Sequence, residues 1–264
     1  MNILNQIKEQ KLIEVATKKS LYPIKLLEQT PFFESACVSM KQYISDPKRS
    51  GIIAEFKRKS PSKGDINKYA NVQEVTLSYM QAGASALSVL TDEKFFGAQK
   101  EDLQIARKFN YCPILRKDFI LNEYQIIEAK SIGADVILLI VKMLSAQEVK
   151  SLASFAKSLG MEVFLEFQNE NEINENDSVS IDFAGINNRN LNTFEVEVEN
   201  SIRLAALLPK ETLKIAESGI DAASKMKLLK QNGFDGFLIG EYFMRHSNPG
   251  QKCKELIKQF QNEN

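Results

Sequence analysis

The feature that most constrains the fold is a regular alternation of short apolar runs with longer stretches of helical period, which starts near residue 50. Eight of the runs have the length of a strand. They are 52–57, 86–90, 112–117, 136–141, 162–167, 183–188, 213–218 and 236–240. This pattern predicts a closed (β/α)8 barrel, and a doubly wound open sheet is the alternative. An open sheet usually has a glycine-rich loop after its first strand, whereas the loop here, KRKSPSKG, has one glycine, so the barrel is favoured.

Helices are predicted between the strands, where the apolar residues recur with a helical period. The clearest ranges are 71–83, 122–133, 145–160 and 221–233, and each ends on a glycine. Asn122 and Asp221 are placed to begin two of these helices, and Ser145 with Glu148 has the spacing of a capping box.

The first 48 residues precede the alternation and contain two helical patterns, at about 3–18 and 33–45. A segment of this length buries little core by itself. We therefore expect residues 1–48 to be a helical extension that packs on a catalytic barrel formed by residues 49–264.

Charge and cysteine content argue against several classes of protein. Lys+Arg and Asp+Glu number 34 each, whereas nucleic-acid-binding proteins normally carry a basic excess or stripe. The N-terminus lacks the apolar core of a signal peptide, and no window approaches the roughly 20 apolar residues of a membrane span. Cys37, Cys112 and Cys253 lack CxxC spacing and there is one histidine, so we expect buried thiols and no metal site. A cytoplasmic protein that binds neither nucleic acid nor membrane is the expectation.

Polar side chains recur where the predicted strands end, in phase with apolar residues that precede them. These residues are Glu55, Lys57, Lys117, Glu166, Asn187, Arg189 and Glu217. In a barrel the carboxyl ends of all strands open onto one face, which is where barrel enzymes place their chemistry. We therefore expect these side chains to converge, although a plain ion pair between Glu55 and Lys57 remains an alternative. Arg107 and Lys108, at the end of a helix, are interpreted as surface residues.

Small residues suggest a phosphate site at the same face. Ser60, Ser62 and Lys63 occupy the first loop, Ser218 and Gly219 follow the seventh strand, and Gly240 and Glu241 follow the eighth. Loops after strands seven and eight are a frequent phosphate site of this fold, where backbone N–H groups bind the anion.

Several motifs together resemble indole-3-glycerol phosphate synthase of tryptophan biosynthesis. They are IIAEFKRKSPSKG, ALSVLTDEKFFGAQKEDL, PILRKDFILNEYQIIEAKSIGADVILLI, GINNRNLNTFEV, ESGI and GFLIGEYFMR, in order between about residues 48 and 250. The resemblance implies a lyase without metal or cofactor that closes the ring of 1-(2-carboxyphenylamino)-1-deoxyribulose 5-phosphate and releases CO2 and water. The N-terminal helical extension is also expected of that family.

The resemblance implies roles for the matching residues. Lys117 would be the general acid at the substrate carbonyl. Lys57 would hold the departing carboxylate and is a candidate proton donor in the dehydration, in which Glu166 would be the acid–base group. Glu55 would orient the two lysines. Substrate polar groups would be positioned by Asn187, Arg189 and Glu217.

The remaining implied contacts are with the two ends of the substrate. Phe119 and Leu138 would pack against the anthranilate ring. The phosphate would be bound by Ser60, Ser218, Gly219, Gly240 and Glu241. The chain departs from the family pattern at Gln168, at Glu241, where only the backbone N–H suits a phosphate, and at 98–99.

Three other functions fit a barrel with these residues. A phosphosugar aldose–ketose isomerase needs an acid–base pair but no cation for a departing carboxylate. An aldolase would use Lys117 as a Schiff base, and a catalytically inactive barrel would serve only as a binding partner. The expected partner is a small phosphorylated substrate, and the sequence is compatible with a monomer.

Overall fold

The computed structural model describes residues 3–188 and 198–262, in which eight parallel strands close into a barrel. The strands are β1 (Ile52–Phe56), β4 (Ala86–Leu90), β5 (Ile114–Lys117), β6 (Val136–Ile140), β7 (Glu162–Phe167), β8 (Phe183–Asn187), β9 (Leu213–Glu217) and β10 (Gly236–Ile239). Their order is β1-β10-β9-β8-β7-β6-β5-β4, and β1 pairs with both β10 and β4. The predicted barrel is confirmed, and the open sheet is wrong because β1 has a neighbour on each side.

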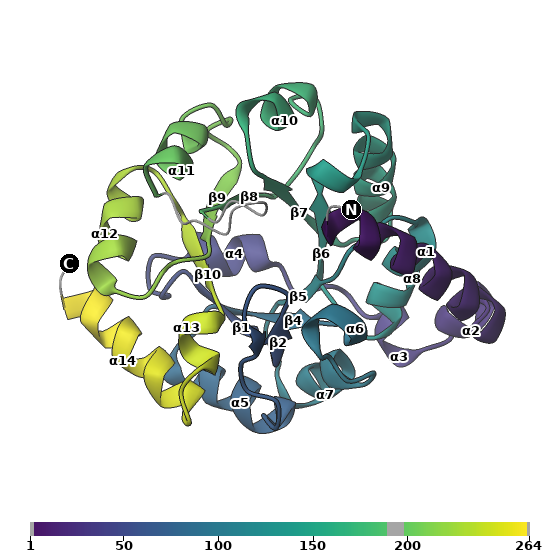
Figure 1. The fold of residues 1–264 in the computed structure, drawn as a ribbon, viewed down its shortest axis with the longest axis horizontal. Helices are drawn as coiled ribbons and strands as arrows, with labels where there is room; N and C mark the ends of the chain where they lie inside the picture. The colour runs from purple at the N-terminus through teal and green to yellow at the C-terminus, as the bar shows by residue number, and fades with distance from the viewer. Residues whose placement is uncertain (1–2, 189–197, 263–264) are drawn as a thin grey trace.

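Helices surround the barrel as a ring (Figure 1). They are α5 (Val72–Ala82), α6 (Glu93–Phe96), α7 (Asp102–Phe109), α8 (Glu123–Ser131), η1 (Val141–Met143), α9 (Ala146–Ser158), α10 (Glu170–Glu175), α11 (Val198–Ala205), α12 (Ala223–Gln231), α13 (Glu241–Met244) and α14 (Pro249–Asn262). The four predicted crossover helices are present. Gly83 ends α5 with a φ of 99°, a left-handed conformation that glycine adopts at little cost. The capping box of Ser145 and Glu148 is formed, and Asn122 caps α8.

Two predicted helix boundaries are wrong. The pattern at 33–45 is not one helix but two, α3 (Pro31–Glu34) and α4 (Met40–Ser45). They are separate because Ser39 begins α4 as its N-cap and accepts a hydrogen bond from the backbone of Gln42. Asp221 does not cap α12: its carboxylate pairs with Lys225 at 2.8 Å, and Ala222 occupies the N-cap position without a side-chain bond.

Two further features differ from expectation. Arg107 is not a simple surface residue, because its guanidinium pairs with buried Asp135 and donates to the carbonyl oxygens of Gly133 and Cys112. The loop after β1 contains an unpredicted two-stranded hairpin, formed by β2 (Lys59–Ser60) and β3 (Gly64–Asp65).

The strand alternation divides the core into an inner and an outer part. Ile53 belongs to the cluster inside the barrel, whereas Ala54 and Phe56 belong to the cluster between strands and helices. Burial of each large apolar side chain contributes about 1.5–3 kcal/mol. The alternation also directs the residues that follow the inner apolar ones into the mouth of the barrel.

The N-terminal helices contact both ends of the barrel. At the amino ends of the strands, Glu162 of β7 accepts a hydrogen bond from the Met40 backbone, and Met40 and Ile44 of α4 pack in the inner cluster. At the carboxyl ends, Leu4 and Ile7 of α1 (Ile3–Leu21) join the same cluster. Helix α1 then passes along α8 toward α2 (Ile24–Leu27), as Figure 1 shows.

Candidate active site

Four charged side chains point into the cavity at the carboxyl ends of the strands. They are Glu55 of β1, Lys117 of β5, Glu166 of β7 and Glu217 of β9. These strands alternate around the barrel, so the four side chains form one layer of its interior, which we call the polar layer. Each lies two positions after an inner apolar residue, as Glu55 follows Ile53, which explains its inward direction.

Lys117 is the centre of the contacts in the polar layer. Its Nζ lies 2.5 Å from Glu217 Oε2 and 3.1 Å from Glu166 Oε2. Asn187 donates a hydrogen bond of 3.0 Å from Nδ2 to Glu166 Oε1, which holds that carboxylate in place. The Lys117 ammonium also lies 5.7 Å from the ring centre of Phe164, within the range of a cation–π contact. These contacts orient the lysine toward the centre of the barrel.

Lys57 forms a second pair with Glu55 at the same mouth. Its Nζ lies 2.6 Å from Glu55 Oε1, and its side chain is 15% exposed, compared with 4% for Glu55. The pair predicted from the alternation of β1 is therefore present. Because both residues also line the cavity, the pair is part of the site rather than a separate surface contact.

Burial shifts the pKa values of the polar layer. The pKa of Glu217 is raised to about 8, chiefly by burial and then by repulsion from Glu166, while Lys117 opposes the shift. Burial alone would lower the pKa of Lys117, but attraction to Glu166 and Glu217 outweighs it, so that pKa lies above its ordinary value. At neutral pH the lysine is therefore an ammonium ion, and the two pKa values belong to one coupled pair of groups.

Two glycines make room for the carboxylates. A Cβ on Gly185 of β8 would lie 2.2 Å from Phe164 Cε1 and 2.3 Å from Glu217 Oε1. A Cβ on Gly240 would lie 2.4 Å from Glu55 Oε1. At both positions a side chain would force neighbouring atoms to shift, so Gly240 has a steric reason for being glycine besides its predicted place at the phosphate.

A cavity of about 450 Å³ opens above the polar layer. Most of the predicted site residues that the structure describes line it, but Lys63 of the first loop does not. The lining residues include Glu55, Lys57, Ser60, Lys117, Phe119, Leu138, Glu166, Asn187, Glu217, Ser218, Gly219, Gly240 and Glu241. Arg189 lies outside the described residues. The volume is within the range typical of small-molecule sites, roughly 300–1,000 Å³.

One wall of the cavity is apolar and includes residues that sequence reasoning missed. Phe96 packs beside the predicted Phe119, with ring centres 5.8 Å apart. Helix α1 adds Ile3, Leu4 and Ile7 to this wall. The apolar face of the N-terminal helix was a signal for packing, but nothing local indicated that it packs at the active site.

The opposite rim contains small and basic residues. Ser218 and Gly219 both have a φ of 67° in the turn after β9. Lys225 and Arg245 also line the cavity and were missed. Lys225 lies in the first turn of α12, where a cation opposes the helix dipole. This unfavourable position was a signal in the sequence that could have indicated a functional role for Lys225.

Of the residues that depart from the family pattern, Glu241 lines the cavity, whereas Gln168 and residues 98–99 lie away from the lining. Gln168 accepts a hydrogen bond of 3.2 Å from Lys142, and the Gln99 backbone donates to Asp102 at 2.7 Å. The prediction of buried thiols is confirmed for Cys112 and Cys253 and is wrong for Cys37, which is only partly buried. Burial raises the pKa of the Cys112 and Cys253 thiols to about 12, which keeps them protonated.

The described part of the chain contains no group of three or more His, Cys, Asp or Glu side chains arranged to hold a metal ion. No described helix combines the length and apolar character needed to cross a bilayer.

Comparisons with known proteins point to one family. Residues 4–256 match the family model described as indole-3-glycerol phosphate synthase. A protein of that name from Bacteroides thetaiotaomicron is 46% identical over 260 residues, which cover 98% of this chain and 99% of the relative. Another from Magnetococcus marinus is 39% identical over 267 residues, covering 97% and 98%.

Among solved structures, 3-hexulose-6-phosphate synthase from Salmonella typhimurium has a TM-score of 0.64 at 10% identity, over 81% of this chain and 100% of that one. At that identity the likeness shows the barrel fold alone. Because the family model and the two relatives match nearly the whole chain, the chain belongs to the indole-3-glycerol phosphate synthase family.

Proposed function

We propose that the polar layer and the cavity above it divide the acid–base work of this family's reaction. The chain is a carboxy-lyase with indole-3-glycerol phosphate synthase activity, and its substrate is phosphorylated. That substrate is 1-(2-carboxyphenylamino)-1-deoxyribulose 5-phosphate, and CO2 and water leave as the indole ring forms. The chemistry needs an acid at the carbonyl, a cation for the carboxylate and an acid–base group for dehydration.

Lys117 is the general acid of ring closure. Glu166 and Glu217 keep its Nζ protonated and hold it within 3.1 Å and 2.5 Å of their oxygens. The ammonium donates first a hydrogen bond and then a proton to the carbonyl oxygen while the aryl carbon attacks, so no oxyanion accumulates in the buried cavity. This charged lysine between two buried carboxylates is the observation that carries the proposal.

Lys57 and Glu166 serve the two later steps. The Lys57 ammonium binds the aryl carboxylate, and the electron pair of the breaking C–C bond returns to the ring system as CO2 leaves. Glu166, held by Asn187, is the acid–base group of the dehydration, and Lys57 is the candidate donor of the proton that leaves with water. Glu55 orients Lys57 through their contact of 2.6 Å.

The two ends of the cavity suit the two ends of the substrate. The wall of Phe119 and Leu138 packs against the anthranilate ring. The phosphate lies at the rim of small residues, and Arg189 positions substrate polar groups. That rim consists of Ser60, Ser218, Gly219, Gly240 and Glu241, the last through its backbone N–H.

The test replaces Lys117 by alanine and follows indole fluorescence and CO2 release together. We expect K117A to lower kcat by about 10²–10⁴-fold while substrate binding remains measurable by titration. K142M is the matched control, because Lys142 contacts Gln168 and does not line the cavity. Near-normal kcat in K117A would contradict the proposal. An isomerase would release no CO2, and a borohydride-trapped adduct would indicate the aldolase.

We further propose that residues 1–48 are an extension of a single catalytic barrel, and that the protein acts as a cytoplasmic monomer. The packing of α1 and α4 on opposite ends of the barrel supports the first statement. Light scattering at working concentration tests the monomer, and the mass of a dimer would contradict it. Cell fractionation tests the cytoplasmic location, and recovery of the protein in the membrane fraction would contradict it.

A further inference from the structure

The turn after β9 has a constrained backbone where the proposed phosphate site begins. Ser218 has a φ of 67°, and among residues 3–188 and 198–262 it is the single non-glycine residue with a positive φ. Residues with a Cβ rarely adopt this conformation, and such strain persists only where the surrounding contacts enforce it.

Asn188 supplies such a contact from outside the cavity. Its Nδ2 donates a hydrogen bond of 2.8 Å to the Ser218 carbonyl, and its backbone N–H donates one of 2.8 Å to the Glu217 carbonyl. Asn188 is 3% exposed and does not line the cavity. Its amide therefore acts on the turn and not directly on a ligand.

The next carbonyl of the turn is held as well. Lys225 Nζ donates to the Gly219 carbonyl at 3.1 Å. Within the described residues, the backbone N–H groups of Ser218, Gly219 and Ile220 donate to no protein acceptor, and all three residues line the cavity. Successive N–H groups that are free in this way form a concavity suited to an anion.

We infer that Asn188 is a positioning residue for substrate phosphate, which acts by holding the Ser218 carbonyl so that the turn keeps its binding conformation. The inference rests on the proposed phosphate role of this turn. Without the amide, Ser218 relaxes toward negative φ in part of the population. The apparent affinity for the phosphate falls in proportion to the fraction of molecules that keep the binding conformation. The free-energy cost of positive φ for a residue with a side chain corresponds to a change of about tenfold in this affinity.

Asn176 is a matched control elsewhere in the barrel. Its Nδ2 donates to the Glu172 carbonyl at 2.9 Å, and it is 4% exposed. Among the residues that the structure describes, neither Asn176 Oδ1 nor Asn188 Oδ1 has a hydrogen-bond partner. N176A therefore removes the same kind of buried hydrogen bond without touching the cavity lining.

The experiment measures kcat and KM of N188A, N188D and N176A with the phosphorylated substrate and with its dephosphorylated analogue, and the inhibition constant of inorganic phosphate. N188D is included in case N188A does not fold, because it keeps the side-chain volume and removes the Nδ2 hydrogen-bond donor. We expect the Asn188 variants to raise KM and the phosphate inhibition constant about tenfold, with kcat and the analogue's kcat/KM within about twofold. N176A should change thermal stability alone. Equal losses for both substrates, or an effect equal to that of N176A, would overturn the inference.

A second arm uses S218G to separate the contact from the rest of the turn. Because glycine adopts positive φ at little cost, N188A should change KM by less than about threefold in the S218G background. A full tenfold change there would refute the coupling. Wild-type kcat/KM that does not depend on the phosphate group would overturn the proposed phosphate role itself, whereas a phosphate-dependent wild type with an unaffected N188A would overturn the role of Asn188 alone.

Discussion

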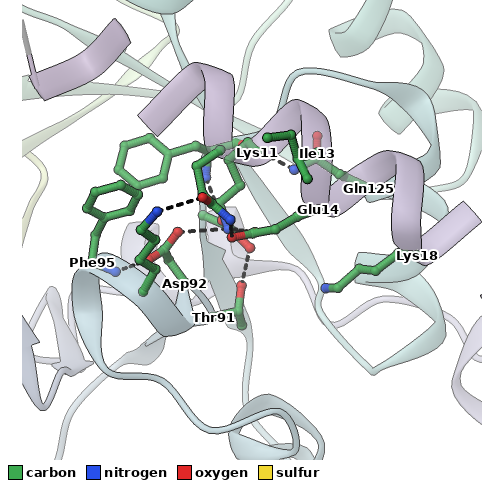
Figure 2. A network of polar contacts seen from close by, with 12 residues as sticks. Lys11, Ile13, Glu14, Lys18, Thr91, Asp92, Phe95 and Gln125 are labelled. Carbon is green, nitrogen blue, oxygen red and sulfur yellow. Dashed lines mark hydrogen bonds and ion pairs between the residues drawn. The ribbon is translucent and has the colours of Figure 1, made fainter. Parts of the chain in front are cut away.

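Replacement of Lys11 by methionine should destabilise the protein far more than an ordinary helix-surface substitution. Lys11 of α1 is 4% exposed, and its Nζ lies 2.8 Å from Asp92, 2.9 Å from Asp118 and 2.9 Å from Glu14. Figure 2 shows this ammonium reaching from the helix into the group of carboxylates. Methionine keeps much of the apolar stem and removes the charge.

The size of the destabilisation in K11M depends on which polar contacts the carboxylates retain without the ammonium group. Asp118 retains hydrogen bonds from Thr91 at 2.6 Å and Arg116 at 3.0 Å, so it stays compensated. Asp92 is fully buried, and within residues 3–188 and 198–262 its Oδ2 has no hydrogen-bond partner besides the ion pair with Lys11. Removal of one partner from a buried pair costs about 3–5 kcal/mol, which is roughly 6–20 °C in the unfolding midpoint.

The assay compares thermal unfolding of K11M with that of K18M. Lys18 lies on the same helix and pairs with Glu128 at 2.7 Å, but it is 34% exposed, so its loss should cost about 1 kcal/mol or less. The double variant K11M/D92N should recover part of the loss because it removes the uncompensated charge. A K11M shift no larger than that of K18M would refute the reasoning.

The pH dependence of K11M gives a second check on the same ion pairs. Burial lowers the pKa of Lys11, but Asp118 and Asp92 raise it by more, so it lies above its ordinary value. Its contribution is therefore fully present below the unfolded pKa of about 10.4 and is lost only as the pH rises through the folded value. The difference between wild type and K11M should be constant across neutral pH.

Two further predictions concern the polar layer. Burial raises the pKa of Glu217 to about 8, so the free-enzyme kcat/KM should show an apparent pKa near that value, and E217Q should lack it. Because this pKa is raised in the folded protein, the contribution of Glu217 to stability is present below about pH 4.3 and is lost as the pH rises through about 8. Wild type should therefore lose stability relative to E217Q over that range. Parallel curves of stability against pH for the two proteins would contradict the assignment. G185A should lower the unfolding midpoint by the equivalent of about 1–3 kcal/mol and reduce kcat, because the new methyl group would meet Phe164 and Glu217 at 2.2–2.3 Å; an active G185A of normal stability would show that the site can relax.

Local rules predicted much of this molecule correctly. The alternation of side chains in a strand depends on the residue itself and its neighbours, so the inward directions of Glu55, Lys117, Glu166 and Glu217 were predictable. Helix ends such as Gly83 are local for the same reason. The errors at Asp221 and at 33–45 arose because several nearby residues can begin or interrupt a helix, and packing decides between them.

The sequence by itself determined the eight-strand barrel and the face on which its polar residues gather, because these depend on period and order along the chain. Its motifs indicated the family by resemblance. Only the tertiary structure decided the electrostatics of the site. The raised pKa of Glu217 reflects its burial and its repulsion by Glu166, and it is opposed by Lys117, a residue 100 positions away in the sequence. The same is true of α1 as a cavity wall and of Asn188 behind the Ser218 turn, since contacts between distant segments leave no periodic trace in the sequence.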